Sequence, residues 1–178
     1  MKEKLFLTIP EIKDLYFKKE LKEDPNTMDY NKGYDVSYNG YNYNNGTIKT
    51  DINELKDLWY PKWINNWPQT YYAYITKENG SFIGETYAKW DEARNAYEIG
   101  IIIKGEYRGR GYSSTVIGLL CDKLKELGAK KLYHELPTER IGAIKAEINN
   151  GFVIVKENID GMKKFGEIEK LVYLEKTL

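Results

Sequence analysis

Residues 107–114 (Tyr-Arg-Gly-Arg-Gly-Tyr-Ser-Ser) have the composition best suited in this chain to bind a phosphate group. They follow an apolar run at 97–103 and open an amphipathic stretch at 112–127, so we predict a strand, a turn and a helix. Glycines let backbone N–H groups approach a ligand, and a helix N-terminus adds unpaired donors and about half a positive charge. The segment predicts a phosphate or pyrophosphate site, although a plain charged turn would have the same composition.

Two widespread phosphate loops do not fit this segment. A Walker loop needs Gly-Lys followed by Ser or Thr, and no such run follows the glycines. The dinucleotide fingerprint Gly-x-Gly-x-x-Gly would need a glycine at position 114, where the chain has Ser114.

The segment does resemble the acetyl-CoA loop of the GNAT N-acetyltransferase superfamily, written Arg/Gln-x-x-Gly-x-Gly/Ala. Arg108 takes the first position and Gly111 the middle glycine, while Ser113 stands where Gly or Ala is usual. The resemblance implies acetyl-CoA as cosubstrate, with main-chain contacts from Ile101 and Ile103 to its pantetheine arm. It implies a pyrophosphate site over the backbone of Gly109, Arg110, Gly111, Tyr112, Ser113 and Ser114. The side chains of Arg108 and Arg110 would add charge at the phosphates or clamp the loop.

A second segment, residues 140–152, is similar to the GNAT helix of the form Asn-x-x-Ala…Tyr…Gly-Phe. Ala143 and the Gly151-Phe152 pair match, Arg140 replaces the Asn, and Glu147 replaces the Tyr. Many members use that tyrosine to protonate the CoA thiolate. An ionised glutamate cannot donate a proton, so this acid is either absent or supplied by another tyrosine. The two segments cover roughly the C-terminal half of the chain.

The activity that the resemblance implies is acetyl transfer to a primary amine of a small molecule or a peptide. Such an amine has a pKa near 10.4, so removing its proton at pH 7 costs roughly 4–5 kcal/mol and requires a base. Glu98 is the first candidate, because GNAT enzymes of the histone-acetylating kind place a glutamate on the strand before the loop. An ordinary ion-paired strand carboxylate is the alternative. Glu85, Glu135 and His134, the only histidine, are further candidates for the base.

Two other functions remain open at this point. A non-catalytic acyl-CoA sensor of the same fold would bind the cofactor without transferring its acetyl group. A protein-interaction domain with a vestigial loop would bind no CoA.

Composition sets further bounds. A chain of 178 residues suits one domain, residues 1–178, and 27 basic against 27 acidic residues favour no nucleic-acid partner. Cys121 is the only cysteine, which excludes an internal disulfide and favours a reducing compartment, and it falls on an apolar helix stripe.

With one histidine and no cysteine cluster, we expect no metal site. The N-terminus lacks an apolar leader and no long apolar run exists, so we expect a cytoplasmic protein without a membrane partner. Oligomeric state is not indicated.

A segment rich in Tyr, Asn and Gly, residues 30–46, is polar and turn-forming. We expect an ordered surface loop whose tyrosine rings cover the edge of the core; a substrate-facing loop is the alternative.

The remaining periodicity predicts a mixed, mostly antiparallel α/β sheet with helices on both faces, an order that also resembles the GNAT fold. Strands are expected at 5–9, 70–76, 81–90, 95–103, 131–134, 152–158 and 167–174, the last two joined around Gly161. Helices are expected from Pro10 to about residue 23, from the cap Asp51 with a break at Pro61, at 112–127, and after the cap Thr138.

Overall fold

The computed structural model describes residues 3–178. Its centre is a seven-stranded sheet with strand order β1-β2-β3-β4-β5-β7-β6, in which only the β4–β5 pair is parallel. The strands are β1 (Leu5–Thr8), β2 (Thr70–Lys77), β3 (Phe82–Asp91), β4 (Ala96–Ile103), β5 (Lys131–Pro137), β6 (Val153–Lys164) and β7 (Glu167–Thr177). The predicted mixed, mostly antiparallel sheet is therefore confirmed.

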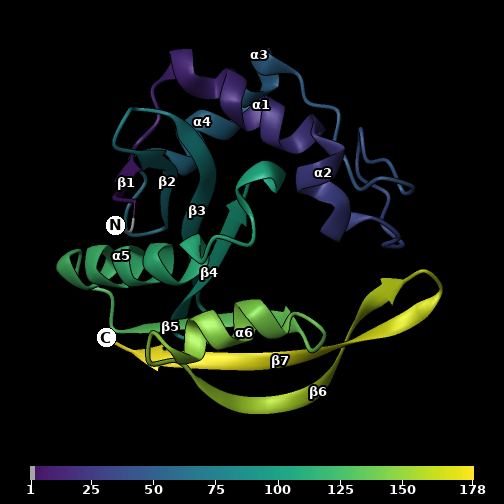
Figure 1. Ribbon diagram of the computed structural model, residues 1–178, viewed down its shortest axis with the longest axis vertical. Coiled ribbons are helices and arrows are strands. Elements are labelled where there is room, and N and C mark those ends of the chain that lie inside the picture. The colour runs from purple at the N-terminus through teal and green to yellow at the C-terminus, as the bar shows by residue number, and fades with distance from the viewer. Residues whose placement is uncertain (1–2) are drawn as a thin grey trace.

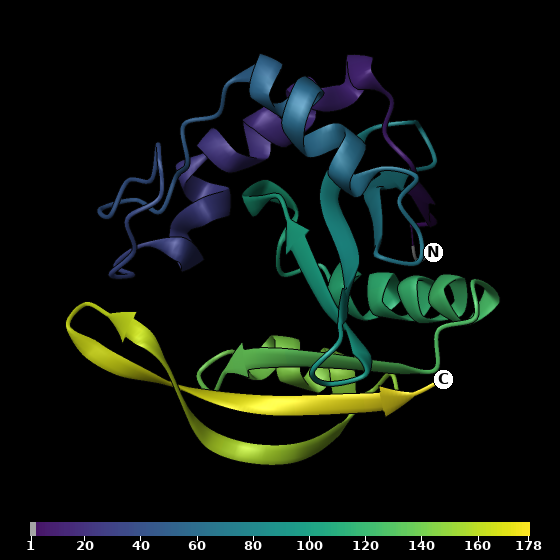
Figure 2. The ribbon, with the colours of Figure 1, turned by 180° about the vertical axis from the view of Figure 1, so that it is seen from behind.

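Helices occupy both faces of this sheet, as Figures 1 and 2 show. The N-terminal half contributes η1 (Ile12–Asp14), α1 (Leu15–Glu23), α2 (Pro25–Met28), η2 (Asp29–Asn31), α3 (Ile52–Glu54), the π-helical η3 (Leu55–Trp59) and α4 (Tyr60–Trp63). The C-terminal half contributes the short turn η4 (Gly105–Tyr107), the long α5 (Tyr112–Glu126) and α6 (Ile141–Ile148).

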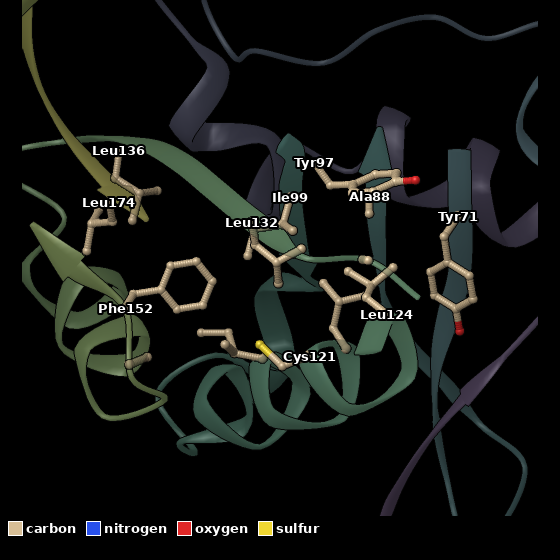
Figure 3. Packing of buried hydrophobic residues seen from close by; sticks show 14 of the residues in the cluster. Tyr71, Ala88, Tyr97, Ile99, Cys121, Leu124, Leu132, Leu136, Phe152 and Leu174 are labelled. Atoms are coloured by element: carbon tan, nitrogen blue, oxygen red, sulfur yellow. The ribbon is translucent and has the colours of Figure 1, made fainter. Parts of the chain in front are cut away.

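Successive side chains of β2 point to opposite faces of the sheet, and each face is covered by a different group of helices. Tyr72 and Tyr74 pack against Phe17 and Leu21 of α1, whereas Tyr71 and Ala73 belong to the cluster beneath α5. The α5 cluster is the larger of the two, and its apolar stripe meets β4, β5 and β7 (Figure 3). Cys121 lies in this cluster and is buried, as the helical periodicity predicts.

Two predicted boundaries are wrong, and each has a local cause. The β6–β7 turn lies at Phe165 and Gly166, both with positive φ, rather than at Gly161, where an added Cβ atom would lie 3.0 Å from the Leu171 side chain. Thr138 does not cap α6, because its N–H donates to Lys170 of β7 at 2.9 Å and keeps that residue with the sheet. The helix begins only at Ile141, after Arg140.

The helical region after Asp51 follows its prediction more closely. The Asp51 side chain accepts a bond from the N–H of Asn53 at 2.7 Å, as an N-cap should. The helix changes from π to α at Tyr60, one residue before Pro61. The helical run is continuous from Ile52 to Trp63, and Pro61, which has no N–H to donate, comes just after its π-helical turn.

Within residues 3–178, no helix combines the length and the apolar character needed to cross a membrane.

Candidate active site

A cleft forms where β4 and β5 separate. The two parallel strands pair only at Tyr97–Leu132 and Glu98–Tyr133, although β4 continues to Ile103 and β5 to Pro137. The resulting hollow has a volume of about 590 Å³. Its walls come from β4, β5 and the first turns of α5 and α6, and its lining includes Gly100, Ile101, Ile103, Arg108, Ser113, His134, Arg140 and Glu147.

Backbone groups of β4 are available on the cleft side. The N–H of Lys104 donates to Ile83 of β3 at 2.9 Å, and backbone groups alternate sides along a strand, so those of Ile101 and Ile103 face the gap. The Ile103 carbonyl accepts a bond from Nε of Arg108 at 3.1 Å. Ile101 therefore offers both a donor and an acceptor to an amide-bearing ligand, while Ile103 offers its donor.

The glycine loop closes one end of the cleft. Gly109 and Gly111 both have a φ of 75°, a conformation that side chains other than glycine rarely adopt, and a Cβ atom built on either would meet no protein atom within 4 Å. Gly111 is the N-cap of α5, whose first turn no side chain caps. The first N–H groups of this 15-residue helix are thus available to an anion, the arrangement predicted for the pyrophosphate.

Arg108 clamps the loop, one of the two roles open to it from the sequence. Its guanidinium donates to the carbonyls of Asn26, at 3.2 Å, and of Thr27, and it forms an ion pair with Asp29 at 2.8 Å. These bonds join the glycine loop to α2 and η2. Arg110 lies at the surface, where it donates to the Glu106 carbonyl at 3.3 Å and lies over the Tyr107 ring.

The other side chains of the loop point in different directions. The Tyr112 hydroxyl donates to Glu3, so only its backbone faces the cleft region. Ser113 lines the cleft. The hydroxyl and carbonyl of Ser114 accept bonds from Asn150 at 3.1 and 3.0 Å, which tie α5 to the end of α6.

His134 and Glu147 meet inside the cleft. Nδ1 of His134 is hydrogen-bonded to Oε1 of Glu147, and both residues line the hollow. Glu147 is 2% exposed, and its second oxygen, Oε2, is buried without a hydrogen-bond partner in the described chain. A buried carboxylate oxygen without a donor is costly, so its place beside the predicted cofactor site suggests a functional role. The sequence did not reveal this pair, because its members are 13 residues apart on different elements.

The three glutamate candidates have different surroundings. Glu98 is half-buried at the last β4–β5 pair, just below the cleft, and its charge contributes, after burial and a hydrogen bond to Asp91, to raising the pKa of Tyr133 to about 12. Glu85 is buried and bound to Lys18 at 3.0 Å. Glu135 forms an ion pair with Arg94 at 2.6 Å. Of the four candidates for the base, only His134 lines the cleft itself.

The tyrosine-rich segment packs against the C-terminal hairpin, and its first tyrosine lines the cleft. Tyr34 is buried and donates to Glu169 at 2.6 Å, while the Phe165 N–H donates to Gly33 at 2.7 Å, so the segment meets the tip of the β6–β7 hairpin (Figure 1). Tyr30 lines the cleft, and the guanidinium carbon of Arg140 lies over its ring, 4.7 Å from the ring centroid. Burial raises the pKa of Tyr30 to about 12, so its hydroxyl stays protonated at neutral pH.

Among residues 3–178, no group of three or more His, Cys, Asp or Glu side chains is placed to hold a metal ion.

Solved structures of acetyltransferases share this fold. Spermidine N-acetyltransferase from Vibrio cholerae in complex with CoA and spermine aligns with a TM-score of 0.76 and 19% identity, over 97% of this chain and 95% of that chain. The spermidine/spermine N-acetyltransferase of Vibrio cholerae in complex with manganese ions aligns with a TM-score of 0.72 and 19% identity, over 97% and 92%. At these identities the likeness establishes the fold.

Sequence comparison establishes the family. No curated protein matches the chain significantly. The sequence model of the acetyltransferase (GNAT) family matches residues 41–146, more than half of the chain, including β4 and the whole glycine loop. The chain therefore belongs to the acetyltransferase (GNAT) family.

Proposed function

We propose that this chain, as one domain spanning residues 1–178, transfers the acetyl group of acetyl-CoA to a primary amine of a small molecule or a peptide. The observation that carries the proposal is the uncapped N-terminus of α5. It follows two glycines with positive φ and opens into the gap between β4 and β5, in a chain of the GNAT family.

The described residues fit CoA. The loop from Gly109 to Ser114 offers backbone donors to a pyrophosphate, and Arg108 holds that loop in place from behind. Ile101 and Ile103 offer strand-like bonds to the amides of a pantetheine arm. Bound acetyl-CoA supplies a thioester, whose carbonyl carbon is the electrophile.

Glu98 remains our proposed base. In the transfer, a bond forms between the amine nitrogen and the acetyl carbon, the carbon–sulfur bond breaks, and the amine proton must go to a base. Glu98 belongs to the last β4–β5 pair, and its charge, after burial, helps to raise the pKa of Tyr87, which pairs with Gly100 two residues further along β4. A water molecule would connect the amine with Glu98, since Gly100 already lines the hollow.

His134 is our proposed acid for the departing sulfur. With Nδ1 bonded to Glu147, a protonated His134 holds its transferable proton on Nε2. Glu147 is then a positioning residue that fixes the ring and its tautomer, as a buried carboxylate does for a catalytic histidine. This pair would fill the role of the tyrosine that Glu147 replaces.

The sensor alternative is less well supported. A binding module needs the loop and the strand edge but has no use for an acid–base pair in the cleft. In a sensor, the buried and unpartnered Oε2 of Glu147 would lower the stability of the fold and serve no function.

A cytoplasmic location stays a prediction, supported by the single buried cysteine.

A two-step experiment tests the proposal. CoA at about 100 times its dissociation constant should stabilise the fold by roughly 2.7 kcal/mol and raise its melting temperature. Release of the CoA thiol from acetyl-CoA should then accelerate when an acceptor amine is added. Binding without any amine-dependent release would favour the sensor, and the absence of a thermal shift at millimolar CoA would refute both.

A further inference from the structure

An aromatic cavity lies next to the cofactor cleft and shares one lining residue with it. It has a volume of about 300 Å³, and its lining is Lys18, Lys22, Trp59, Trp63, Tyr72, Glu85 and Tyr87. Tyr87 also lines the cofactor cleft. Its ring lies so close to β4 that a Cβ atom at Gly100 would be 2.2 Å from it. The two hollows therefore meet at this ring over Gly100, beside the strand that the pantetheine arm would follow.

The walls of the cavity are flat and rigid. Trp59 contacts Tyr72 edge to face at 4.7 Å between centroids, and Trp63 contacts Tyr87 in the same way at 5.4 Å. Such walls suit an acceptor with a flat or aliphatic body.

The one carboxylate in the cavity is already fully engaged. Glu85 binds the Lys18 ammonium at 3.0 and 3.2 Å and accepts a bond from the Tyr72 hydroxyl. Lys18 itself lies over the rings of Trp59, at 4.4 Å, and Tyr72, at 4.7 Å, and is 3% exposed. An aromatic cage with a carboxylate is the kind of site that binds ammonium groups, and here the chain's own lysine occupies it.

Once Glu85 is paired with Lys18, the remaining charged side chain in the cavity is basic. Lys22 lines the cavity and makes no ion pair or side-chain hydrogen bond within the described residues, and burial together with the Lys18 ammonium lowers its pKa. An outer hollow of about 430 Å³ shares Lys22, Trp59 and Trp63 with the cavity and adds Lys49, Lys62 and Glu54. The two hollows together present four lysines (Lys18, Lys22, Lys49 and Lys62) against two glutamates (Glu54 and Glu85).

We infer that this cavity is the acceptor site of the proposed transferase, and that it selects amines carrying a carboxylate, which Lys22 binds. The inference rests on the proposed function for the meaning of acceptor. A polycation is disfavoured here, because its second ammonium would meet Lys22 while Glu85 stays occupied by Lys18. The cavity volume suits a molecule of amino-acid size.

Matched pairs of acceptors test this directly. Lysine against cadaverine, and tyrosine against tyramine, differ only by the carboxylate, and spermidine represents a polycation. We expect kcat/KM to be at least about tenfold higher for each carboxylate member, the effect of one charged hydrogen bond. Lys22→Met should bring each ratio close to one by raising KM for the carboxylate member alone. Lys125→Met, an exposed lysine on α5, is the control and should change neither ratio.

A binding measurement separates the cavity from the chemistry. 3-(4-Hydroxyphenyl)propionate has the carboxylate and ring of tyrosine but no amine, so it cannot be acetylated. With CoA present it should quench tryptophan fluorescence saturably in the wild type and at least about fivefold more weakly in Lys22→Met. Quenching without any acetyl transfer would uphold the cavity and overturn the proposed function. Transfer that prefers the decarboxylated amines, or that ignores Lys22→Met, would overturn the cavity inference and leave the transferase intact.

Discussion

His134 Nδ1 is bonded to Oε1 of Glu147 across the gap between β5 and α6, and both side chains line the cofactor cleft. Glu147 occupies the helix position at which the family carries a tyrosine, so the chain places a carboxylate–imidazole pair where others have a phenol. A carboxylate that accepts from Nδ1 fixes the tautomer and leaves Nε2 for chemistry. Where Glu147 replaces the usual tyrosine, the chain also provides a hydrogen-bond partner for it, His134 of β5.

Glu147→Gln should lower kcat by about 10- to 100-fold with CoA affinity unchanged, because an amide, unlike a carboxylate, can also donate to Nδ1 and so no longer fixes the tautomer of His134. His134→Gln should lose a similar factor. The double variant should be no worse than either single one, because the pair acts as a unit. Steady-state kinetics and the CoA-induced thermal shift check these expectations.

Because His134 is the only histidine, its imidazole signals in an NMR spectrum need no assignment. They should move when CoA is added to the wild type. Signals that stay still at saturating CoA would place His134 away from the bound cofactor and refute its role as the acid.

Gly111→Val should abolish the CoA-induced thermal shift while the protein still folds. The branched side chain would project into the open space over the first turn of α5 and would strain a residue with a φ of 75°. Gly128→Val is a matched control, since Gly128 follows the other end of α5 with a φ of 90° and equally open surroundings. Both variants should lose stability, but only Gly111→Val should lose CoA. An unchanged shift in Gly111→Val would move the phosphate site elsewhere.

Arg108→Gln should lower the melting temperature and weaken CoA binding together. The substitution removes the donors to Asn26 and Thr27 and the ion pair with Asp29, so α2 would no longer hold the loop. Arg110→Gln removes one long contact at the surface and should change neither quantity measurably. Weaker CoA binding in Arg108→Gln at an unchanged melting temperature would show that Arg108 contacts the phosphates instead.

The features that the sequence predicts correctly depend on neighbours along the chain. Alternation gives the strands, and the glycines at 109 and 111 give the turn, because positive φ and the missing Cβ are properties of single residues. Gly161 led to a wrong prediction of the turn, because a glycine is also found where a neighbouring side chain leaves no room for a Cβ atom. At Gly161 that side chain is Leu171.

The features that the sequence does not reveal depend on contacts between distant segments. Arg108 binds a turn about 80 residues earlier, and Lys18 finds Glu85 only because α1 lies across β3. No period or motif encodes such pairs. The role of Tyr30 in the cleft is hidden in the same way, since nothing distinguishes it in sequence from the exposed Tyr38 and Tyr43.

Glu98→Gln should lower turnover by roughly 10²–10⁴-fold if Glu98 accepts the amine proton. The amide keeps the shape of the side chain and removes its charge, so CoA affinity should barely change. The same substitution at Glu135, which is held by Arg94 away from the cleft, is the matched control and should leave turnover within about twofold. Full activity of Glu98→Gln would show that Glu98 is not the base. If Glu85→Gln alone loses activity, the change should appear in KM for the acceptor, because Glu85 lines the acceptor cavity rather than the cofactor cleft.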